Sequence, residues 1–396
     1  MAIDPKDIIE RFSVEELCET SEEYFRRIPD PTPLMSKPFA FLHETPEMLQ
    51  NLGLLLSGLH LGKTMTVLDF GAGTCWLSRF LAQLNCLPIA CDASETALAI
   101  GRRLFDEYPL IGTAVYTPVF LHFDGHTIDL PGDSVDRIVC FDAFHHIPNT
   151  REVLSEMGRV LKRGGIAGFS EPGRQHSRSP QSQYEMAHHR VLENDIDLSE
   201  IFGQAEPAGF TALTVKVIAD LEIPLDDYNR IYDGGENASL QAEIRNQTYN
   251  TMFNRSVFFL HKGPLRRDSR SHIGLAHELA AVPSDRSIRA GQSVCVDFTL
   301  RNTGTAAWLH ANSEIFGIVR LGSHLFHADG RLIAIDHSRH ELSRSVEPGE
   351  TLAMRVHVPL PDGPGRYRLV FDLVAEGVTW FENTGSRAVE IEVEVV

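Results

Sequence analysis

The sequence of 396 residues lacks a long apolar stretch, a paired cysteine pattern and an excess of positive charge. Its apolar runs, such as Leu52–Leu61, are interrupted by Gly and Ser and fall short of the ~18–20 residues that a membrane helix needs. The N-terminus is acidic and has no basic stretch followed by an apolar one, so no secretory signal is predicted. We therefore expect a cytoplasmic protein without membrane insertion.

The cysteines and the net charge exclude further classes of protein. The six cysteines form no CxxC pair and no Cys/His cluster, so we expect reduced, buried thiols and predict no metal site. Lys and Arg number 36 against 54 Asp and Glu, which gives a net charge of −18. Because proteins that track phosphates usually carry the opposite sign, nucleic acid is not an expected partner.

The length predicts two or three domains, and the residue pattern changes along the chain. Residues 1–64 are interpreted as a helical lead-in or lid. Residues 65–262 alternate apolar runs with helical patterns, which predicts an α/β fold with a mainly parallel sheet covered on both faces. Within them, 174–250 is interpreted as an insertion, either a substrate-contacting segment or a surface hairpin. After a polar linker, the turn spacing over 273–396 predicts a separate all-β sandwich.

Individual elements are predicted from the apolar runs. Strands of the α/β region are predicted at Thr66–Phe70, Pro88–Cys91, Val119–Phe123, Val135–Phe141, Gly165–Ser170, Thr211–Ala219 and Arg255–His261, and helices at Trp76–Leu84, Ala93–Phe105 and Arg151–Leu161. Strands of the C-terminal region are predicted at Ser293–Leu300, Ile315–Leu321, Arg331–Ile335, Thr351–Val358, Gly365–Leu373 and Ala388–Val395.

The segment Val67–Trp76, VLDFGAGTCW, carries the strongest chemical signal. A predicted strand runs into a glycine-rich turn that opens a helix, and glycine lets the backbone turn tightly and approach a ligand. Asp92 ends the next strand, where a carboxylate accepts hydrogen bonds from ribose hydroxyls. Asp124 and Asp142 end the third and fourth strands, at the edge where such sheets bind ligands. The structural alternative for each Asp is the cap of a helix or loop.

In the order of its motifs the sequence resembles the class I S-adenosylmethionine-dependent methyltransferases. The motifs are VLDFGAGTC, CDAS, HFDG, CFDAFHHIPN, VLKRGG and GFSEPG, across residues 65–172. Nicotinamide dehydrogenases instead carry GxGxxG. One departure is Cys75, which stands where the family often has a third glycine. The resemblance implies a Rossmann-like, seven-stranded methyltransferase domain with S-adenosyl-L-methionine as its cofactor.

The resemblance also implies which residues hold this cofactor. The methionine end would lie against Asp69 and the glycine turn, the ribose against Asp92, and the adenine near Asp124. The sulfonium would lie beside Asp142. The full set is Asp69, Gly71, Ala72, Gly73, Asp92, Ala93, Phe123, Asp124, Gly125, Asp142 and Ala143.

Methyl transfer to a hydroxyl needs a group that removes the proton as the oxygen approaches the methyl carbon. His145 and His146 follow the predicted fourth strand, and histidine titrates near neutral pH. Glu171 ends the fifth strand, from which it could orient one imidazole. We expect these three residues to be catalytic, an arrangement that resembles sugar O-methyltransferases. The alternative is that one histidine only packs.

Weaker candidates lie before the first predicted strand and after the fifth. They are Lys37, Phe39 and His43 as a lid over the cofactor, and His176, Tyr184, His188 and His189 as substrate contacts or surface residues. Asp142, Glu171 or the histidines could bind a metal, but no ligand spacing demands one.

The C-terminal region resembles Ig-like domains of bacterial surface-glycan proteins through Asn302–Trp308 and the pair Trp380 and Phe381. An exposed Trp308 or Trp380 could stack on a sugar, and the alternative for each is a place in the core. The region could also wall the cleft or join a homo-oligomer. The leading hypothesis is O-methylation of a sugar hydroxyl in a nucleotide-sugar, glycan or glycosylated metabolite. Methylation of a phenol, quinone or amine, and a glycan-binding scaffold with a vestigial methyltransferase fold, are the alternatives.

Overall fold

The computed structural model describes residues 2–108, 111, 116, 118–235, 237–311 and 316–396. The chain forms two compact units. The N-terminal unit comprises Met1–Leu59 and Met65–Leu265, and the C-terminal unit comprises His60–Thr64 and Arg266–Val396. Among the described residues, every helix is too short or too polar to cross a membrane.

The N-terminal unit contains strands and helices in alternation. Its strands are β1 (Thr66–Phe70), β2 (Leu87–Asp92), β3 (Val119–His122), β4 (Val135–Phe141), β5 (Leu161–Pro172), β6 (Phe210–Lys216) and β7 (Arg255–Lys262). Its α-helices are α1 (Pro5–Arg11), α2 (Val14–Arg27), α3 (Thr32–Met35), α4 (Thr45–Leu59), α5 (Trp76–Gln83), α6 (Glu95–Glu107), α7 (Thr150–Val160), α8 (Pro180–His189), α9 (Leu198–Ala205), α10 (Leu225–Tyr232) and α11 (Ala238–Asn254). Short 3-10 turns are η1 (Phe144–His146), η2 (His176–Arg178) and η3 (Glu206–Ala208).

The strands form one seven-stranded sheet in the order β3-β2-β1-β4-β5-β7-β6. The pairs from β3 through to β5 are parallel, whereas β7 runs antiparallel to both β5 and β6. The predicted Rossmann-like, mainly parallel sheet is therefore confirmed.

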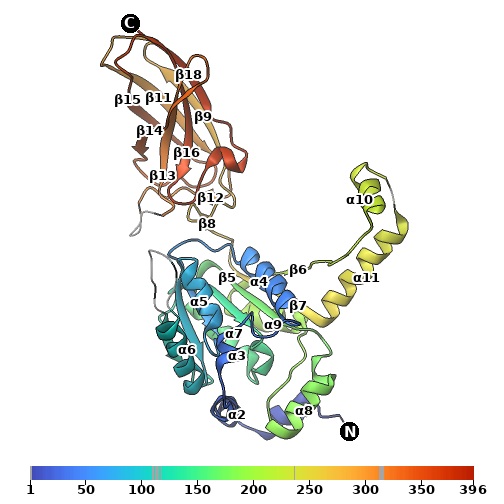
Figure 1. Ribbon diagram of the computed structural model, residues 1–396. Coiled ribbons are helices and arrows are strands. Elements are labelled where there is room, and N and C mark those ends of the chain that lie inside the picture. Colours follow the sequence, from blue (N-terminus) through green and yellow to red (C-terminus); the bar gives the residue numbers. More distant parts are fainter. Residues whose placement is uncertain (1, 109–110, 112–115, 117, 236, 312–315) are drawn as a thin grey trace. The chain divides into compact units, whose positions relative to one another are not determined.

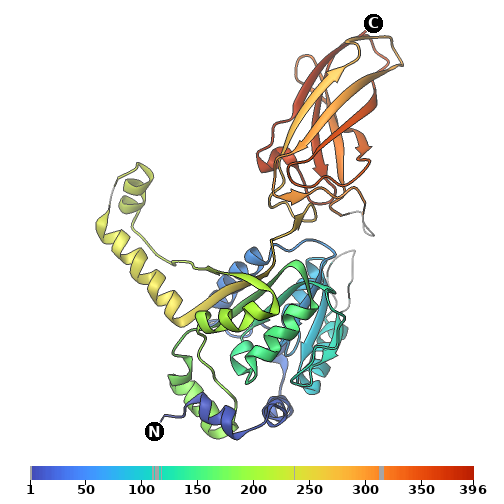
Figure 2. The ribbon, with the colours of Figure 1, turned by 180° about the vertical axis from the view of Figure 1, so that it is seen from behind.

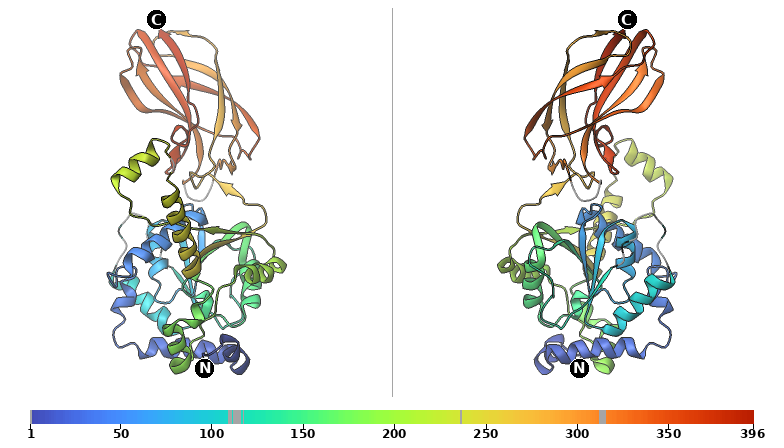
Figure 3. Two further views of the ribbon diagram at one scale, coloured as in Figure 1. Left: turned by 90° about the vertical axis from the view of Figure 1, so that its right-hand side faces the viewer. Right: turned by 90° about the vertical axis from the view of Figure 1, so that its left-hand side faces the viewer.

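Alternate residues of the strands pack against helices on opposite faces of the sheet. Ile89 and Cys91 of β2 belong to the core cluster that includes Val153 of α7, while Ala90 packs in a cluster with Leu98 of α6. Figure 3 shows helices along both sides of this sheet. Burial on both faces explains why the central strands read as continuous apolar runs in the sequence.

Most predicted strand positions agree with the structure, and the start of β5 differs. Helix α7 ends at Val160, and β5 begins at Leu161, before the predicted start of the strand at Gly165. Leu161 is fully buried and pairs with Val135 of β4. This pairing draws the chain into the sheet directly after the helix.

The irregular segment between β5 and β7 has two different parts. Its first part, with α8, packs Met186 and Leu192 against Ile8 of α1 and Leu17 of α2. Its second part, α10 and α11, extends away from the sheet of the N-terminal unit (Figures 1 and 2). This extension exposes large apolar side chains, among them Leu225, Tyr232 and Phe253.

The C-terminal unit is built from strands around its own core. Its strands are β8 (Arg267–Asp268), β9 (His277–Pro283), β10 (Ser287–Ile288), β11 (Ser293–Asn302), β12 (Ala306–Ala307), β13 (Val319–His327), β14 (Leu332–Glu341), β15 (Thr351–Pro359), β16 (Gly365–Ala375), β17 (Thr379–Trp380) and β18 (Val389–Val395), with the 3-10 turn η4 (Phe381–Thr384). One sheet has the order β10-β18-β16-β13-β14, with β17 beside β16, and a second has the order β15-β11-β9. One buried cluster contains residues of both sheets, such as Phe298 of β11 and Phe371 of β16.

The structure places the two tryptophans in different surroundings. Trp308 is fully buried in this core and cannot stack on a sugar. Trp380 is partly exposed, and it is contacted by the guanidinium of Arg339 and the ring of His324, each 4.3 Å from the centre of its ring. The predicted strand at 315–321 begins outside the described residues, and its described end belongs to β13.

Candidate active site

A cavity of about 530 Å³ lies at the carboxyl ends of the parallel strands in the N-terminal unit. Its walls include residues that directly follow or end β1, β2 and β4, and also the lead-in helix α2. Glu22 anchors this helix by accepting hydrogen bonds from the hydroxyls of Ser94 and Thr96 at the start of α6. Burial raises the pKa of Glu22, but these hydrogen bonds outweigh it and lower the pKa to about 2. Such a volume is typical of a site for a small ligand.

The glycine turn after β1 forms one wall of the cavity. Gly71 and Gly73 have φ values of 71° and 52°, in the left-handed region that favours glycine. A Cβ atom on Gly71 would lie 2.3 Å from the Cβ of Ala143, so the turn and the loop after β4 touch closely. Cys75, at the position of the family's third glycine, is buried, and its Sγ fills the space beside Gly101 of α6. The cavity wall therefore keeps its bare backbone despite the cysteine.

Asp92 and Asp69 support this turn from different sides. Asp92 lines the cavity, and its carboxylate accepts hydrogen bonds from the backbone N–H of Gly73 at 2.7 Å and of Ser94 at 2.8 Å. Burial raises the pKa of Asp92. The carboxylate of Asp69 points to the hydroxyl of Ser78 on α5, at 2.6 Å, and burial raises the pKa of Asp69 to about 7. Each carboxylate oxygen of Asp92 keeps a second acceptor position for a ligand.

Asp124 and Asp142, which look alike in the sequence, have different surroundings. Asp124 is exposed, and it accepts hydrogen bonds from the backbone N–H groups of His126 and Thr127, so it caps a turn. Its neighbours Phe123 and Gly125 line the cavity. Asp142 lines the cavity as well, and its Oδ1 lies 2.5 Å from a guanidinium nitrogen of Arg255 on β7.

The remaining predicted cofactor residues also lie at the cavity. Those that line it are Gly71, Ala72, Gly73, Ala93 and Ala143. Of the predicted lid residues, Lys37 lines the cavity, whereas Phe39 and His43 are exposed.

Glu171 organises the loop after β4. Its side chain is fully buried, and it accepts hydrogen bonds from the backbone N–H groups of Ala143 and Phe144 and from Nδ1 of His145 at 2.7 Å. Burial raises the pKa of Glu171, but the bond and charge of His145 and the backbone donors outweigh it and lower the pKa to about 2. Burial lowers the pKa of His145, but the partnership with Glu171 raises it above its ordinary value.

His146 lies against His145, with 3.8 Å between the ring centres. Its Nδ1 lies 2.6 Å from the backbone carbonyl oxygen of Leu192 and donates a hydrogen bond to it, so Nε2 carries the lone pair. Removal from bulk water and the neighbouring His145 lower the pKa of His146 to about 4. Both histidines line the cavity, and the His146 side chain is 39% exposed against 7% for His145.

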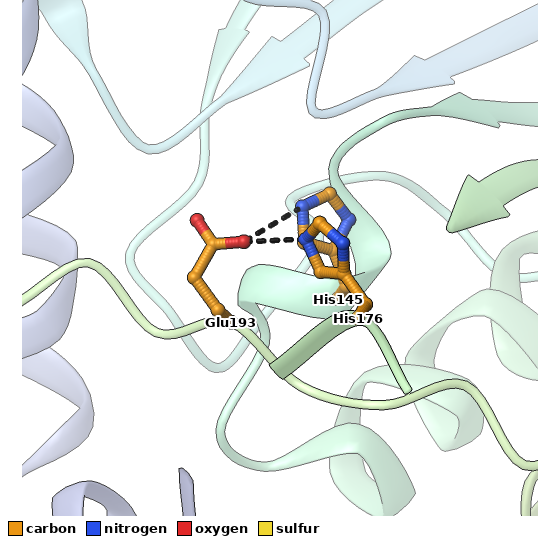
Figure 4. A group of neighbouring side chains, drawn as sticks. All are labelled: His145, His176 and Glu193. Atoms are coloured by element: carbon orange, nitrogen blue, oxygen red, sulfur yellow. Dashed lines mark hydrogen bonds and ion pairs between the residues drawn. The ribbon is translucent and has the colours of Figure 1, made fainter. Parts of the chain in front are cut away.

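Sequence reasoning missed Glu193 and Arg255 and gave His176 little weight. Glu193 lies after α8 in no recognisable motif, and its carboxylate faces the rings of both His145 and His176 (Figure 4). The other predicted substrate contacts, Tyr184, His188 and His189, are exposed on α8 outside the cavity wall. Glu193 is followed by Asn194 and Asp195, and such a polar run carries no signal that the Glu193 side chain lies at the site.

Residues 68–169 match the protein family described as Methyltransferase domain. The chain contains a methyltransferase domain. An uncharacterized methyltransferase of Mycobacterium tuberculosis (strain ATCC 25618 / H37Rv) is 32% identical over 102 residues, which are 26% of this chain and 48% of that protein. The demethylmenaquinone methyltransferase of Clavibacter sepedonicus is 32% identical over 109 residues, 27% of this chain and 42% of that protein. The chain thus spans less than half the length of these relatives.

The methyltransferase domain also resembles solved structures at a distance. A phosphoethanolamine N-methyltransferase 2 of Haemonchus contortus gives a TM-score of 0.44 at 16% identity. The matched region covers 64% of this chain and 60% of that protein's chain. The YcgJ protein from Bacillus subtilis gives a TM-score of 0.38 at 19% identity, and the matched region covers 54% of this chain and 99% of that protein's chain.

S-adenosylmethionine is the cofactor of such a methyltransferase domain, and the residues of the cavity fit it. The glycine turn offers bare backbone to the methionine end, because a Cβ atom on Gly71 would already meet Ala143. Asp92 offers acceptor positions to ribose hydroxyls. Phe123 contributes an apolar wall beside which a flat purine ring can lie.

Proposed function

We propose that this protein transfers the methyl group of S-adenosylmethionine to a hydroxyl of a small molecule, and that the acceptor is a sugar. The observation that carries the proposal is the neighbouring pair His145 and His146 at the cavity, with the ring of His145 held by Glu171. When bound, the cofactor supplies an electrophilic methyl group on a sulfonium. The chain's residues then have to place the hydroxyl in line with this group and receive its proton.

The cofactor roles follow the cavity wall. Asp92 binds the ribose hydroxyls, and the Gly71–Gly73 turn lies against the methionine end. Asp69 acts from behind the wall, because its carboxylate holds Ser78 on α5. Asp124 acts indirectly as well: it caps the turn that presents Phe123 and Gly125.

The two histidines take different parts in this proposal. The bond from His146 to the carbonyl of Leu192 leaves its Nε2 as an acceptor, and this ring is the more open of the two to the cavity. We therefore assign His146 as the base that takes the hydroxyl proton. His145 is nearly buried between Glu171 and His146, and with Glu171 it positions the loop and the second ring.

Several observations support a sugar as the acceptor. The cavity wall contains side chains that can donate or accept hydrogen bonds, which a molecule with many hydroxyls needs: Thr20, Ser21, Asn149, Gln181 and Glu185. The His-His arrangement with an acid from the fifth strand resembles that of sugar O-methyltransferases. The appended β-sandwich, which we propose to be Ig-like, is consistent with a glycan-related role.

A second candidate acceptor is a quinone or phenol. It is favoured by the similarity of residues in the methyltransferase domain to demethylmenaquinone methyltransferases. A phenol is more acidic than a sugar hydroxyl, so it depends less on a base than an alcohol does.

The test is a methyl-transfer screen with the full chain. Nucleotide-sugars, glycans, phenols, quinones and amines are offered with S-adenosylmethionine, and release of S-adenosylhomocysteine is measured together with the product mass. Turnover of nucleotide-sugars or glycans alone is the expected result, and turnover of phenols or quinones alone would replace the sugar by the second candidate. If calorimetry detects no binding of S-adenosylmethionine, the scaffold alternative is correct and the proposal fails.

A further inference from the structure

The cavity contains a cluster of two histidines and one glutamate, of which the proposed function uses only His145. His145, His176 and Glu193 come from η1, η2 and the segment after α8, and all three line the cavity. One ring nitrogen of each histidine and one carboxylate oxygen of Glu193 lie within 4.8 Å of one another. Figure 4 shows both imidazoles facing the same side of the Glu193 carboxylate.

The hydrogen bonds around the cluster leave possible metal-ligand atoms of the three residues close to one point. Nδ1 of His145 is bonded to Glu171, so Nε2 is the ring nitrogen that faces Oε2 of Glu193, 3.9 Å away. This distance is too long for a hydrogen bond. Oε2 of Glu193 also faces Nε2 of His176 at 2.5 Å. One ring nitrogen of each histidine thus approaches the same carboxylate oxygen.

From this geometry we propose that His145, His176 and Glu193 bind a divalent transition-metal ion inside the cavity. Atoms that bind one Zn²⁺ at about 2.1 Å lie roughly 3 to 4 Å from each other. The distance between His145 and Glu193 already falls in this range. His176 and Glu193 need to separate by less than about 1 Å, which a side-chain rotation provides.

The surroundings of His145 are those of a metal-binding histidine. Metal-binding histidines usually donate their other ring N–H to a carboxylate or carbonyl, which fixes the ring and its tautomer. Glu171 does this for His145, and Glu171 is itself fixed by two backbone N–H groups. The hydroxyl of Ser182 lies 3.3 Å from both Nε2 of His176 and Oε2 of Glu193.

The donor set indicates the class of metal. Two imidazole nitrogens and one carboxylate oxygen suit Zn²⁺, Fe²⁺, Co²⁺ or Ni²⁺, whereas Mg²⁺ and Ca²⁺ prefer oxygen ligands. Three protein ligands leave at least one position open, as in catalytic metal sites. Asp142 is not needed as a ligand, because its carboxylate is paired with Arg255.

The consequence for catalysis rests on the proposed function, but the metal site itself does not. An open metal position beside His146 would bind the acceptor hydroxyl and make it more acidic, so that His146 removes its proton more easily. The acceptor would then be one that offers a hydroxyl to a metal, such as a sugar.

Metal binding is tested without any acceptor, on the full chain without an affinity tag. After treatment with a chelator, Zn²⁺ binding is measured by calorimetry and Co²⁺ binding by visible absorption. The variants are His176→Asn and Glu193→Gln, with His188→Asn as the control, because His188 is an exposed histidine outside the cavity wall. Binding of S-adenosylmethionine and thermal unfolding show whether each variant is folded.

We expect one Zn²⁺ per wild-type chain, competing with Co²⁺, and at least about 100-fold weaker binding in both cavity variants. The control variant should bind like the wild type, and Glu171→Gln, which changes only the outer partner, should lose about 10- to 100-fold. Wild-type binding no tighter than that of folded His176→Asn and Glu193→Gln would overturn the proposal. If the chain binds metal but transfers no methyl group to any acceptor, the proposed function is contradicted and the metal site stands. If the chain has no affinity for zinc and still transfers methyl groups after chelation, the metal site alone is contradicted.

Discussion

The carboxylate of Glu171 lies 2.7 Å from Nδ1 of His145 and also accepts hydrogen bonds from two backbone N–H groups of the same loop. One buried side chain thus fixes both the ring and the backbone beside the predicted cofactor site. The substitution Glu171→Gln removes the charge and keeps the shape of the side chain, so it separates these hydrogen-bond and charge effects from packing.

Glu171→Gln should lower kcat by ~10²–10⁴, because the amide cannot accept hydrogen bonds with both ends and no longer balances the charge of His145. The affinity for S-adenosylmethionine, measured by calorimetry, should stay within about threefold of the wild type. An equal loss in cofactor affinity and in kcat would show that Glu171 is merely structural.

His146→Asn should also lower kcat by ~10²–10⁴ and leave cofactor binding intact. Asparagine keeps a donor near the position of Nδ1, so the contact to Leu192 can persist while the acceptor at Nε2 is lost. His189→Asn on the exposed face of α8 is the matched control and should turn over like the wild type. Normal turnover by His146→Asn would assign the base elsewhere.

Asp92 and Asp124 form a matched pair for testing cofactor binding. Asp92→Asn should weaken binding of S-adenosylmethionine by about 10- to 100-fold, because a charged acceptor at the cavity is lost. Asp124→Asn should change the affinity by less than about threefold, since this side chain caps an exposed turn and Asn caps turns as well. Equal effects of the two changes in calorimetry would contradict the ribose assignment.

Gly71→Ala should weaken cofactor binding and lower the melting temperature. The added Cβ would lie 2.3 Å from the Cβ of Ala143, and a misfit of this kind costs about 1–3 kcal/mol. Adding Ala143→Gly should restore part of the loss, and the remainder is the cost of a positive φ for alanine, about 1–2 kcal/mol. Gly53→Ala on α4 is the control, because a Cβ there meets no atom within 4 Å. No recovery in the double variant would contradict this close approach.

Asp69 should make the stability of the N-terminal unit depend on pH. Its pKa in the folded protein is about 7 because of burial, above its value in an unfolded chain. Between about pH 4 and 7 the folded state therefore holds a proton that the unfolded state has lost, so stability falls as the pH rises. Asp69→Asn lacks this proton equilibrium.

The stability difference between wild type and Asp69→Asn should change by up to roughly 4 kcal/mol between pH 4 and 8, in favour of the variant at high pH. Hydrogen exchange of amides in β1 and β4 measures it, since these strands report on the opening of this unit. A difference that is constant with pH would show that Asp69 is ionised in the folded chain.

The sequence by itself determined most strands of the N-terminal unit and the glycine turn. The bounds of β1 and β4 match the predicted strands, because apolar runs of a sheet buried on both faces are a local signal. The turn at Gly71 is also local, since its positive φ depends on the residue type at that position. The position of His145, His146 and Glu171 near the carboxyl ends of the strands is predictable for the same reason, because each follows or ends a predicted strand.

Only the tertiary structure decided what the strand-end acids do and which distant residues join them. Asp92 lines the cavity, Asp69 turns to Ser78, and Asp124 caps a turn, although all three lie in or directly after a strand. Side-chain direction depends on the pleat and on the loop that follows, which the spacing of acids does not reveal. Glu193 and Arg255 reach the site through long-range packing, and no local pattern encodes a contact between segments so far apart in the chain.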